Sequence, residues 1–414
     1  MSEKPIPFSK RLQWRLEYFA HSVIEFIARL MPGPWVFHLG EALAGVAWHF
    51  MPRRRRIVLR NLRIAYCDQM ELDEIKQLAK KSFVRAGANL LSSVHTAGLP
   101  AEKLSEVLQI ENLELLQKFA DEGKGVVLLL SHMGNWELLS RLIHFIPEGV
   151  ALGGMYRPLN NPYMDERVRA RRQADGSRMF SKRDSFHQIT GFLRGGGVIG
   201  VLADQRVGRN GDLIQFFGRL TRASPLPSLL ARRAKCDVIA LALTTEEPGR
   251  WKATFLPVEK PYSTRNCMSA LESAMKLGSN DVFWLQERWR VRFKKSRSVS
   301  RLLEDGRSAK NKSHRALLWL VGVDDSWRIP DEWTHPDVVY ELATEPGRRP
   351  PSWLPAATRC HEAPLAGGAG VLEKFIASVD QSSLLPLDLV VAANDADSLV
   401  KACKAVAVDL VGLS

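Results

Sequence analysis

Residues 125–130 read Gly-Val-Val-Leu-Leu-Leu, a short apolar run that follows a Gly-Lys turn. Such a run is typical of a β-strand that is buried on both faces. Similar runs recur at 198–202, after three glycines, and at 238–243. Stretches with helical spacing separate these runs. Strands that alternate with helices predict an α/β sandwich with a central, mostly parallel sheet flanked by helices.

The size and composition of the chain indicate a folded protein with a separate basic part. At 414 residues it can form two hydrophobic cores. Its 45% hydrophobic and 25% charged residues exclude wholesale disorder and a multispanning membrane protein. The net charge is +13, but residues 313–414 hold 8 Lys/Arg and 14 Asp/Glu, so residues 1–312 carry +19. That charge attracts nucleic acid, anionic lipid or an acidic protein, and does not distinguish among them.

The five cysteines are far apart, odd in number and without a CxxC pair, which argues against a disulfide framework or a structural zinc site. A reducing compartment fits this usage best. The N-terminus shows no apolar segment with a small-residue cleavage site, so we predict no secretory signal.

Residues 18–51 are rich in apolar and aromatic side chains but are interrupted by charges and prolines, so they contain no clean spanning run. Four consecutive arginines follow at 53–56, and then come Arg60 and Arg63. Together these features predict monotopic helices that lie on an anionic membrane surface. The alternative is a pair of amphipathic helices packed on the core with a solvated arginine face. A nucleic-acid arm is disfavoured because the adjoining sequence is apolar.

The chain divides into four predicted regions. Residues 72–120 have helical spacing with breaks at Gly87, Gly98 and Pro100, which predicts two or three helices. Residues 297–313 are rich in Ser, Lys and Arg and are typical of a linker. We therefore predict a membrane-associating helical segment at 1–64, a main α/β domain at 65–296, a linker at 297–313, and a small α/β domain at 314–414.

The pattern of the C-terminal domain predicts its own strands and helices. Strands are expected at 316–323, 338–342, 388–392 and 406–413, and helices at 371–379 and 396–406. Residues 388–397 and 408–413 are distantly similar to the nucleotide-sugar half of heptosyltransferase-type glycosyltransferases. The sequence stops where that fold would continue, so we expect a non-catalytic module.

The run at 125–130 leads into Ser131-His132-Met133-Gly134-Asn135-Trp136-Glu137. In a uniform helix, residues five apart point roughly 140° away from each other. His132 is therefore expected in the turn that leaves the strand, with Glu137 in a helix that starts just after it and the two side chains within reach. A carboxylate that orients a histidine makes it a general base for an alcohol. The alternative is a structural histidine beside a surface glutamate.

The stretch Leu-Ser-His-Met-Gly-Asn-Trp-Glu after a buried strand resembles the H-x4-(D/E) signature of the glycerolipid acyltransferases. It is most similar to the bacterial lipid A biosynthesis (lauroyl/myristoyl-type) acyltransferases and the mycobacterial phosphatidylinositol mannoside acyltransferases. Further blocks match in family order over roughly residues 12–295: Met155–Pro162, Lys182-Arg183-Asp184, Val201–Gln205, Phe216–Arg219 with Pro225, and Trp284–Trp289. By this resemblance, residues 65–296 form an acyltransferase domain with a glycerolipid-acyltransferase-like fold.

The resemblance implies an enzyme on the cytoplasmic face of the bacterial inner membrane, either monotopic or held by a single N-terminal anchor. It would move a fatty acyl group from acyl carrier protein, or from coenzyme A, to a hydroxyl of a lipid A-type or related glycolipid or phospholipid. It implies no cofactor, no metal and no nucleic-acid partner. The acceptor, the acyl length and the choice of donor stay open, and so does the oligomeric state. The rival interpretations are a non-catalytic lipid-binding or scaffold protein of the same fold, and a basic nucleic-acid-binding protein.

The resemblance also assigns roles to residues. His132 would deprotonate the acceptor hydroxyl, and Glu137 would orient its imidazole. Arg157 is the best candidate to bind an anionic group, because guanidinium pairs with phosphate in a bidentate manner; the alternative is a surface salt bridge. The other candidates for substrate binding are Asn135, Asp204, Gln205, Arg206 and Arg219, and the alternative is that they satisfy loop backbone. Phe283, Trp284 and Trp289 either line an acyl channel or belong to the core. The basic surface also suits an acidic acyl carrier protein.

Overall fold

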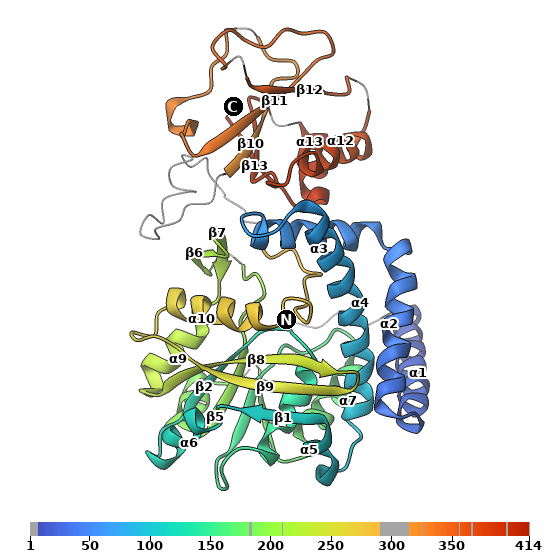
Figure 1. Cartoon of the computed structure of the whole chain (residues 1–414), viewed down its shortest axis with the longest axis vertical. Coiled ribbons are helices and arrows are strands. Elements are labelled where there is room, and N and C mark those ends of the chain that lie inside the picture. Colours follow the sequence, from blue (N-terminus) through green and yellow to red (C-terminus); the bar gives the residue numbers. More distant parts are fainter. Residues whose placement is uncertain are drawn as a thin grey trace. The chain divides into compact units, whose positions relative to one another are not determined.

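The computed structural model describes residues 7–181, 184–208, 210–289, 314–324, 326–355, 357–365, 367–394 and 396–413. These residues form two compact units (Figure 1). The first unit consists of Met1–Phe50, Lys81–Gln205 and Ser224–Phe283, and the second of Met51–Lys80, Arg206–Ala223 and Trp284–Ser414. The chain thus passes between the units several times, and the predicted boundary after residue 64 falls inside a helix. The predicted linker at 297–313 lies outside the described residues.

A seven-stranded sheet forms the centre of the first unit, with the order β1-β9-β8-β2-β5-β3-β4 (Figure 1). Its strands are β1 (Leu108–Glu111), β2 (Val126–Leu130), β3 (Leu152–Met155), β4 (Arg178–Phe180), β5 (Val198–Leu202), β8 (Asp237–Glu247) and β9 (Arg250–Pro257). Neighbours run parallel except β8 and β9, which run antiparallel. The sheet is therefore mixed. The α/β fold and the three predicted strands are confirmed, and β2 is buried along its whole length, as its apolar run predicts.

Helices accompany the sheet in the first unit. They are α1 (Phe8–Leu30), α2 (Gly33–Phe50), part of α4 (Leu72–Thr96), η1 (Ala101–Lys103), α5 (Leu104–Val107), α6 (Glu114–Asp121), η2 (Trp136–His144), α7 (Pro162–Gln173), α8 (Phe186–Arg194), α9 (Leu226–Ala234) and α10 (Thr264–Leu277). Within the described part of the chain, no helix combines the length and the apolar character needed to cross a membrane.

The predicted helix break at Gly87 is wrong, because α4 continues to Thr96. Gly87 instead serves a close helix crossing: a Cβ there would lie 2.4 Å from the Cβ of Ala44 in α2. Gly40 of α2 makes the reciprocal approach, since a Cβ on it would lie 2.7 Å from Cα of Ala88. Both glycines let the two backbones come together, and either side chain would force them apart. The break before Pro100 is confirmed.

The second unit contains a five-stranded parallel sheet with the order β12-β11-β10-β13-β14. The strands are β10 (His314–Trp319), β11 (Val338–Thr344), β12 (Arg359–Glu362), β13 (Leu389–Ala392) and β14 (Asp409–Gly412); the remaining elements are α3 (Pro52–Tyr66), the start of α4, η3 (Asp331–Trp333), α12 (Ala369–Gln381), α13 (Asp397–Val406) and the antiparallel hairpin of β6 (Asp212–Phe216) and β7 (Arg219–Ala223). One face of the sheet packs on α12 and α13, and Trp327, Trp333 and Trp353 cover the other. The small α/β domain is therefore present.

An aromatic cluster forms another core of the second unit. Trp284 and Trp289 stack with ring centroids 6.4 Å apart, and Phe216 and Phe217 pack against them. Arg288 lies 5.6 Å from the ring centroids of Phe216 and Trp284. Trp284 is fully buried. The two tryptophans therefore belong to the core, which is one of the two alternatives that their spacing leaves open.

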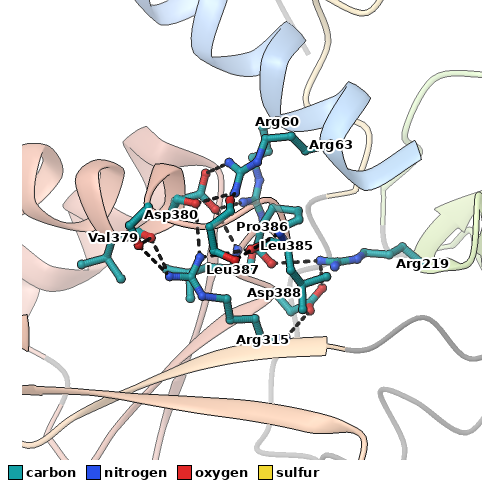
Figure 2. A network of polar contacts seen from close by, with 12 residues as sticks. Arg60, Arg63, Arg219, Arg315, Val379, Asp380, Leu385, Pro386, Leu387 and Asp388 are labelled. Carbon is teal, nitrogen blue, oxygen red and sulfur yellow. Dashed lines mark hydrogen bonds and ion pairs between the residues drawn. The ribbon is translucent and has the colours of Figure 1, made fainter. Parts of the chain in front are cut away.

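The arginines of α3 do not all face solvent, which corrects the prediction for this segment. Arg60 and Arg63 are buried and donate to the two carboxylate oxygens of Asp380, over 2.6 and 3.0 Å (Figure 2). Arg63 also donates to the backbone oxygens of Leu384 and Ser383. These two side chains hold α3 to the C-terminal sheet domain and are not available to lipid headgroups. Arg53 and Arg54 stay exposed, as predicted for a basic surface.

Candidate functional site

Two parallel strands bring the site together at one edge of the first unit's sheet. The register pairs Leu130 of β2 with Leu202 of β5, so both strands end at the same level. The backbone N–H of Ala203 then donates to the oxygen of Leu130 over 2.9 Å. His132 and Asp204 therefore leave the sheet side by side, at the carboxyl ends where open α/β sheets place their ligands.

His132 is paired with Asp204. The distance from His132 Nδ1 to Asp204 Oδ1 is 2.6 Å, and the Asp204 side chain is 1% exposed. An ionised carboxylate can only accept hydrogen bonds, so the proton of a neutral His132 lies on Nδ1. This leaves the lone pair on Nε2 to accept a proton.

The Nε2 side of His132 is open to a small polar group. The side-chain amide of Gln205 lies 3.0 Å from Nε2, and Gln205 is exposed. Trp136 packs edge-to-face on the imidazole, with ring centroids 5.2 Å apart, and Phe283 packs on Trp136 in turn. Asp204 and Trp136 therefore fix the ring, while Nε2 faces the amide of Gln205, an exposed side chain.

Glu137 does not orient His132 in this structure, contrary to the geometric prediction. Its two carboxylate oxygens accept from Nη2 and Nε of Arg172, over 2.6 and 2.9 Å. Burial alone would lower the pKa of Arg172, but Glu137 outweighs it and the pKa is raised. The predicted turn-then-helix geometry is present, since the 3₁₀ helix η2 begins at Trp136. Glu137 points from its first turn toward α7, and Asp204 takes the place beside the imidazole.

The turn that carries His132 is held by a segment late in the first unit. The N–H of Gly134 donates to Asp281 O over 2.9 Å, and the N–H of Phe283 donates to His132 O over 2.7 Å. Gly134 has φ +56°, and a Cβ on it would lie 2.4 Å from Leu243 O, so the turn requires glycine. Asn135, predicted to bind substrate, is buried and donates to Thr96 Oγ1 over 2.9 Å.

The other predicted binding residues are distributed over both units. Arg157 is exposed and follows β3, whose carboxyl end lies at the same edge of the sheet as those of β2 and β5. Arg206 is exposed in the second unit. Arg219, also in the second unit, is 3% exposed and ion-paired with Asp388 (Figure 2). Such a buried pair is unsuited to substrate. Lys182 and Arg183 lie outside the described residues.

Two cavities lie on either side of the Glu137–Arg172 pair in the first unit. The sheet cavity has mainly apolar walls formed by β2, β3 and β5 together with Trp136 and Leu139. Three glycines, Gly153, Gly154 and Gly200, line it on the sheet side. The arginine cavity is lined by residues that include His21, Arg141, Arg171, Arg172 and Asp175. Trp136, Glu137, Ser140 and Arg172 border both cavities.

Arg172 is a site residue that the sequence did not suggest, because no spacing rule connects it with Glu137, which lies 35 positions earlier. The Asn-Pro pair of the Met155–Pro162 block contains the local signal for its helix. Asn161 caps α7 by accepting from the N–H groups of Tyr163 and Met164, and Pro162 begins the helix. Among the described residues, no group of three or more His, Cys, Asp or Glu is placed to hold a metal ion.

An α/β sandwich with a histidine–carboxylate pair at the carboxyl edge of its sheet, beside an apolar cavity, suits an enzyme that moves an acyl group. Comparison with known proteins agrees, because the profile described as bacterial lipid A biosynthesis acyltransferase matches residues 6–291. The chain belongs to this family and is an acyltransferase. The matched residues end before the C-terminal sheet.

Individual relatives are distant in sequence. The chain is 23% identical over 277 residues to the lipid A biosynthesis palmitoleoyltransferase of Escherichia coli (strain K12), which covers 63% of this chain and 87% of that protein. It is 23% identical over 272 residues to the lauroyltransferase of the same organism, with the same coverage. A lipid A biosynthesis acyltransferase of Haemophilus influenzae is 22% identical over 305 residues, or 68% of this chain and 95% of that protein.

Proposed function

We propose that this enzyme transfers a fatty acyl group from a thioester donor to a hydroxyl of a lipid A-type glycolipid, with His132 as general base. The observation that carries the proposal is the 2.6 Å contact between His132 Nδ1 and the buried carboxylate of Asp204. The contact leaves Nε2 as the basic atom, at a sheet edge beside an apolar cavity. The names of the relatives support a lipid A-type acceptor.

The reaction needs one proton to pass from the acceptor hydroxyl to His132 and from His132 to the leaving thiolate. Nε2 of His132 takes the proton of the acceptor hydroxyl, which replaces the Gln205 amide as its neighbour. The hydroxyl oxygen then attacks the thioester carbonyl, the new C–O bond forms, and the C–S bond breaks. The leaving thiolate receives the proton from Nε2. Asp204 stabilises the imidazolium between these steps, so no acyl-enzyme is required. Arg157, exposed at the same edge, is our candidate for an anionic group of the substrate.

The acyl chain fits the sheet cavity by its chemistry. The cavity is lined largely by leucine, methionine and glycine, and Leu130 and Trp136 belong both to its wall and to the immediate surroundings of His132. Burying a methylene group contributes about 0.8 kcal/mol. An acyl chain in the sheet cavity therefore leaves the polar residues of its wall, Glu137, Ser140 and Arg172, with their hydrogen-bond partners.

The donor that suits the surface charge is acyl carrier protein, which is acidic. Residues 1–312 carry a net +19, and such a field raises the rate at which an oppositely charged protein associates. Coenzyme A thioesters, which are also anionic, are the second donor that the chemistry admits.

The test of the proposal is acyl transfer by the purified full-length protein. We expect a lipid A-type acceptor to gain the mass of one acyl group when an acylated carrier protein or an acyl-coenzyme A is supplied, as measured by mass spectrometry. Donors of increasing chain length would measure the depth of the cavity in the same assay. If neither donor gives an acylated lipid, the proposed classes of donor and acceptor are wrong.

We further propose that α1 and α2 dock on the cytoplasmic face of the inner membrane. Large apolar side chains are exposed along both helices: Phe8, Leu12, Leu16, Phe19, Val23, Phe26 and Leu30 on α1, and Trp35, Leu39, Leu43, Val46 and Phe50 on α2. Their spacing of three or four residues puts them on one stripe of each helix. Lys10, Arg11 and Arg15 of α1 add the positive charge that attracts anionic lipid.

Membrane docking predicts the outcome of a vesicle flotation experiment. The double variant Phe19→Glu/Phe26→Glu should bind anionic vesicles at least about tenfold more weakly than the parent, because two aromatic contacts are replaced by like charges. Leu365→Glu changes an equally exposed apolar residue of the C-terminal domain and serves as the control. Equal flotation of the double variant and the parent would contradict docking through α1.

A further inference from the structure

One carboxylate of α1, that of Glu25, is surrounded by three arginines. Arg29 lies one turn further along α1, with Nη2 2.5 Å from Glu25 Oε1. Arg167 of α7 donates from Nε to Oε2 over 2.8 Å, and Arg171 donates to the same oxygen. The Glu25 side chain is only 3% exposed. A single carboxylate neutralises a single guanidinium, so the cluster carries a surplus of two positive charges.

This surplus borders the arginine cavity through Arg171. Two further arginines line the cavity, but each is already neutralised: Arg172 by Glu137, and Arg141 by Asp175 over 2.7 Å. His144 also faces Asp175, with Nε2 3.3 Å from Oδ1. The positive charge that lacks a partner therefore comes from the Glu25 cluster.

His21 lines the cavity beside the Glu25 cluster. Its Nδ1 has no hydrogen-bond partner among the described residues and lies 4.0 Å from Glu25 Oε2. Burial and the charge of Arg171 lower the pKa of His21, and Glu25 opposes them without reversing the direction. The imidazole is a further polar group in the wall of the cavity, beside Arg171.

A half-buried surplus of positive charge is costly unless an anion compensates it. Burial lowers the pKa of Arg171, and Arg167 and Arg29 oppose its protonation although Glu25 favours it. Two surplus charges match a phosphate monoester, which carries close to two negative charges at neutral pH. Guanidinium groups bind phosphate in a bidentate manner, and each arginine of the cluster retains N–H donors for this purpose.

We propose that the arginine cavity binds a phosphate group of a substrate, held by Arg171 with support from Arg29, Arg167 and His21. This inference rests on the proposed acyl transfer only for the identity of the substrate. The phosphate belongs either to a monoester on the headgroup of the glycolipid acceptor, which matches both surplus charges, or to the phosphopantetheine arm of the donor, a phosphodiester with one negative charge. Trp136 packs on the imidazole of His132 and also lines both this cavity and the sheet cavity, so the anion site lies one side chain away from His132.

Direct binding tests the site without turnover. Titration of the full-length protein with inorganic phosphate should show binding that Arg171→Gln weakens about tenfold or more, since a hydrogen bond to a charged group is lost. Arg169→Gln removes the same charge from an exposed position of the same helix and should bind phosphate like the parent. Equal affinity of the Arg171 variant and the parent, or no binding by the parent, overturns the proposal. Either result leaves the acyl-transfer reaction untouched.

Kinetics then identify the source of the phosphate. Arg171→Gln should raise KM about tenfold for a phosphorylated glycolipid and leave KM unchanged for its dephosphorylated form if the acceptor supplies the group. If the donor supplies the phosphate, Arg171→Gln should raise KM for acylated carrier protein and leave KM unchanged for an acyl-pantetheine without phosphate. An unchanged KM for all four substrates overturns the proposal. If the Arg171 variant does not fold, Arg29→Gln takes its place. The side chain of Arg29 is 48% exposed, so this change disturbs the core less.

Discussion

Replacing His132 with alanine should lower kcat for acyl transfer by about 10²- to 10⁴-fold, the usual contribution of a general base. The imidazole is the group whose Nε2 faces the open side of the site, while Nδ1 is committed to Asp204. The change should leave the fold intact, because His132 lies in the turn after β2, and the core is formed by the residues of the strand itself. The measurement is single-turnover transfer from a saturating donor, with circular dichroism as the check on folding. Full activity in this variant would exclude His132 as the base.

The two nearby carboxylates can be separated by a matched pair of variants. Asp204→Asn removes the charge beside the imidazole and should reduce kcat at least about tenfold, while Asp204→Glu should recover part of the loss. Glu137→Gln breaks the pair with Arg172 instead, so its effect on kcat should be smaller. If Glu137→Gln is as damaging as His132→Ala and Asp204→Asn is harmless, the assignment of Asp204 as the positioning residue is wrong.

The sequence predicted where His132 lies but not its partner, and the reason is topological. A buried apolar run followed by a histidine predicts a sheet-edge turn, and β2 and η2 confirm it. The sequence predicts Asp204 as a substrate-binding residue and places the partner of the imidazole five residues away, at Glu137. The actual partner lies 72 residues away and is brought in by the register of β5 on β2. The spacing of residues in the sequence does not reveal which strands are neighbours in the sheet. Sequence reasoning therefore selects the nearby carboxylate, Glu137, as the partner of His132.

Arginine clusters illustrate a second limit of sequence analysis. A run of arginines that binds anionic lipid has the same composition as a run that forms ion pairs with buried carboxylates. The decisive difference for Arg60 and Arg63 is Asp380, more than 300 residues later in the chain. In contrast, the apolar stripes of α1 and α2 are local and periodic. Most of their exposed apolar side chains belong to the interrupted apolar sequence at 18–51, and Phe8, Leu12 and Leu16 extend the stripe of α1 toward its start.

Replacing Asp380 with alanine should destabilise the second unit by about 3–5 kcal/mol, because the buried guanidinium groups of Arg60 and Arg63 lose their carboxylate partner. Its side chain is 5% exposed, and it accepts from Arg60, from Arg63 and from the N–H of Leu387. Total stabilities are about 5–15 kcal/mol, so a loss of this size should show as early unfolding in urea. Glu373→Ala removes a half-exposed partner of Arg56 on the same helix and should cost at most about 1 kcal/mol.

The same network predicts how the second unit responds to acid. Burial would raise the pKa of Asp388, but Arg219 and His314 lower it to about 2. Burial would also raise the pKa of Glu341, but His361 and Arg315 lower it to about 2. The pKa of Asp380 is also lowered, because Arg60 and Arg63 outweigh burial. Unfolded carboxylates titrate near pH 4, so the folded unit binds fewer protons. Its stability should therefore be complete above about pH 5 and fall as the pH drops toward 2. The slope should be shallower in Asp380→Ala, and an identical slope in variant and parent would show that Asp380 titrates normally.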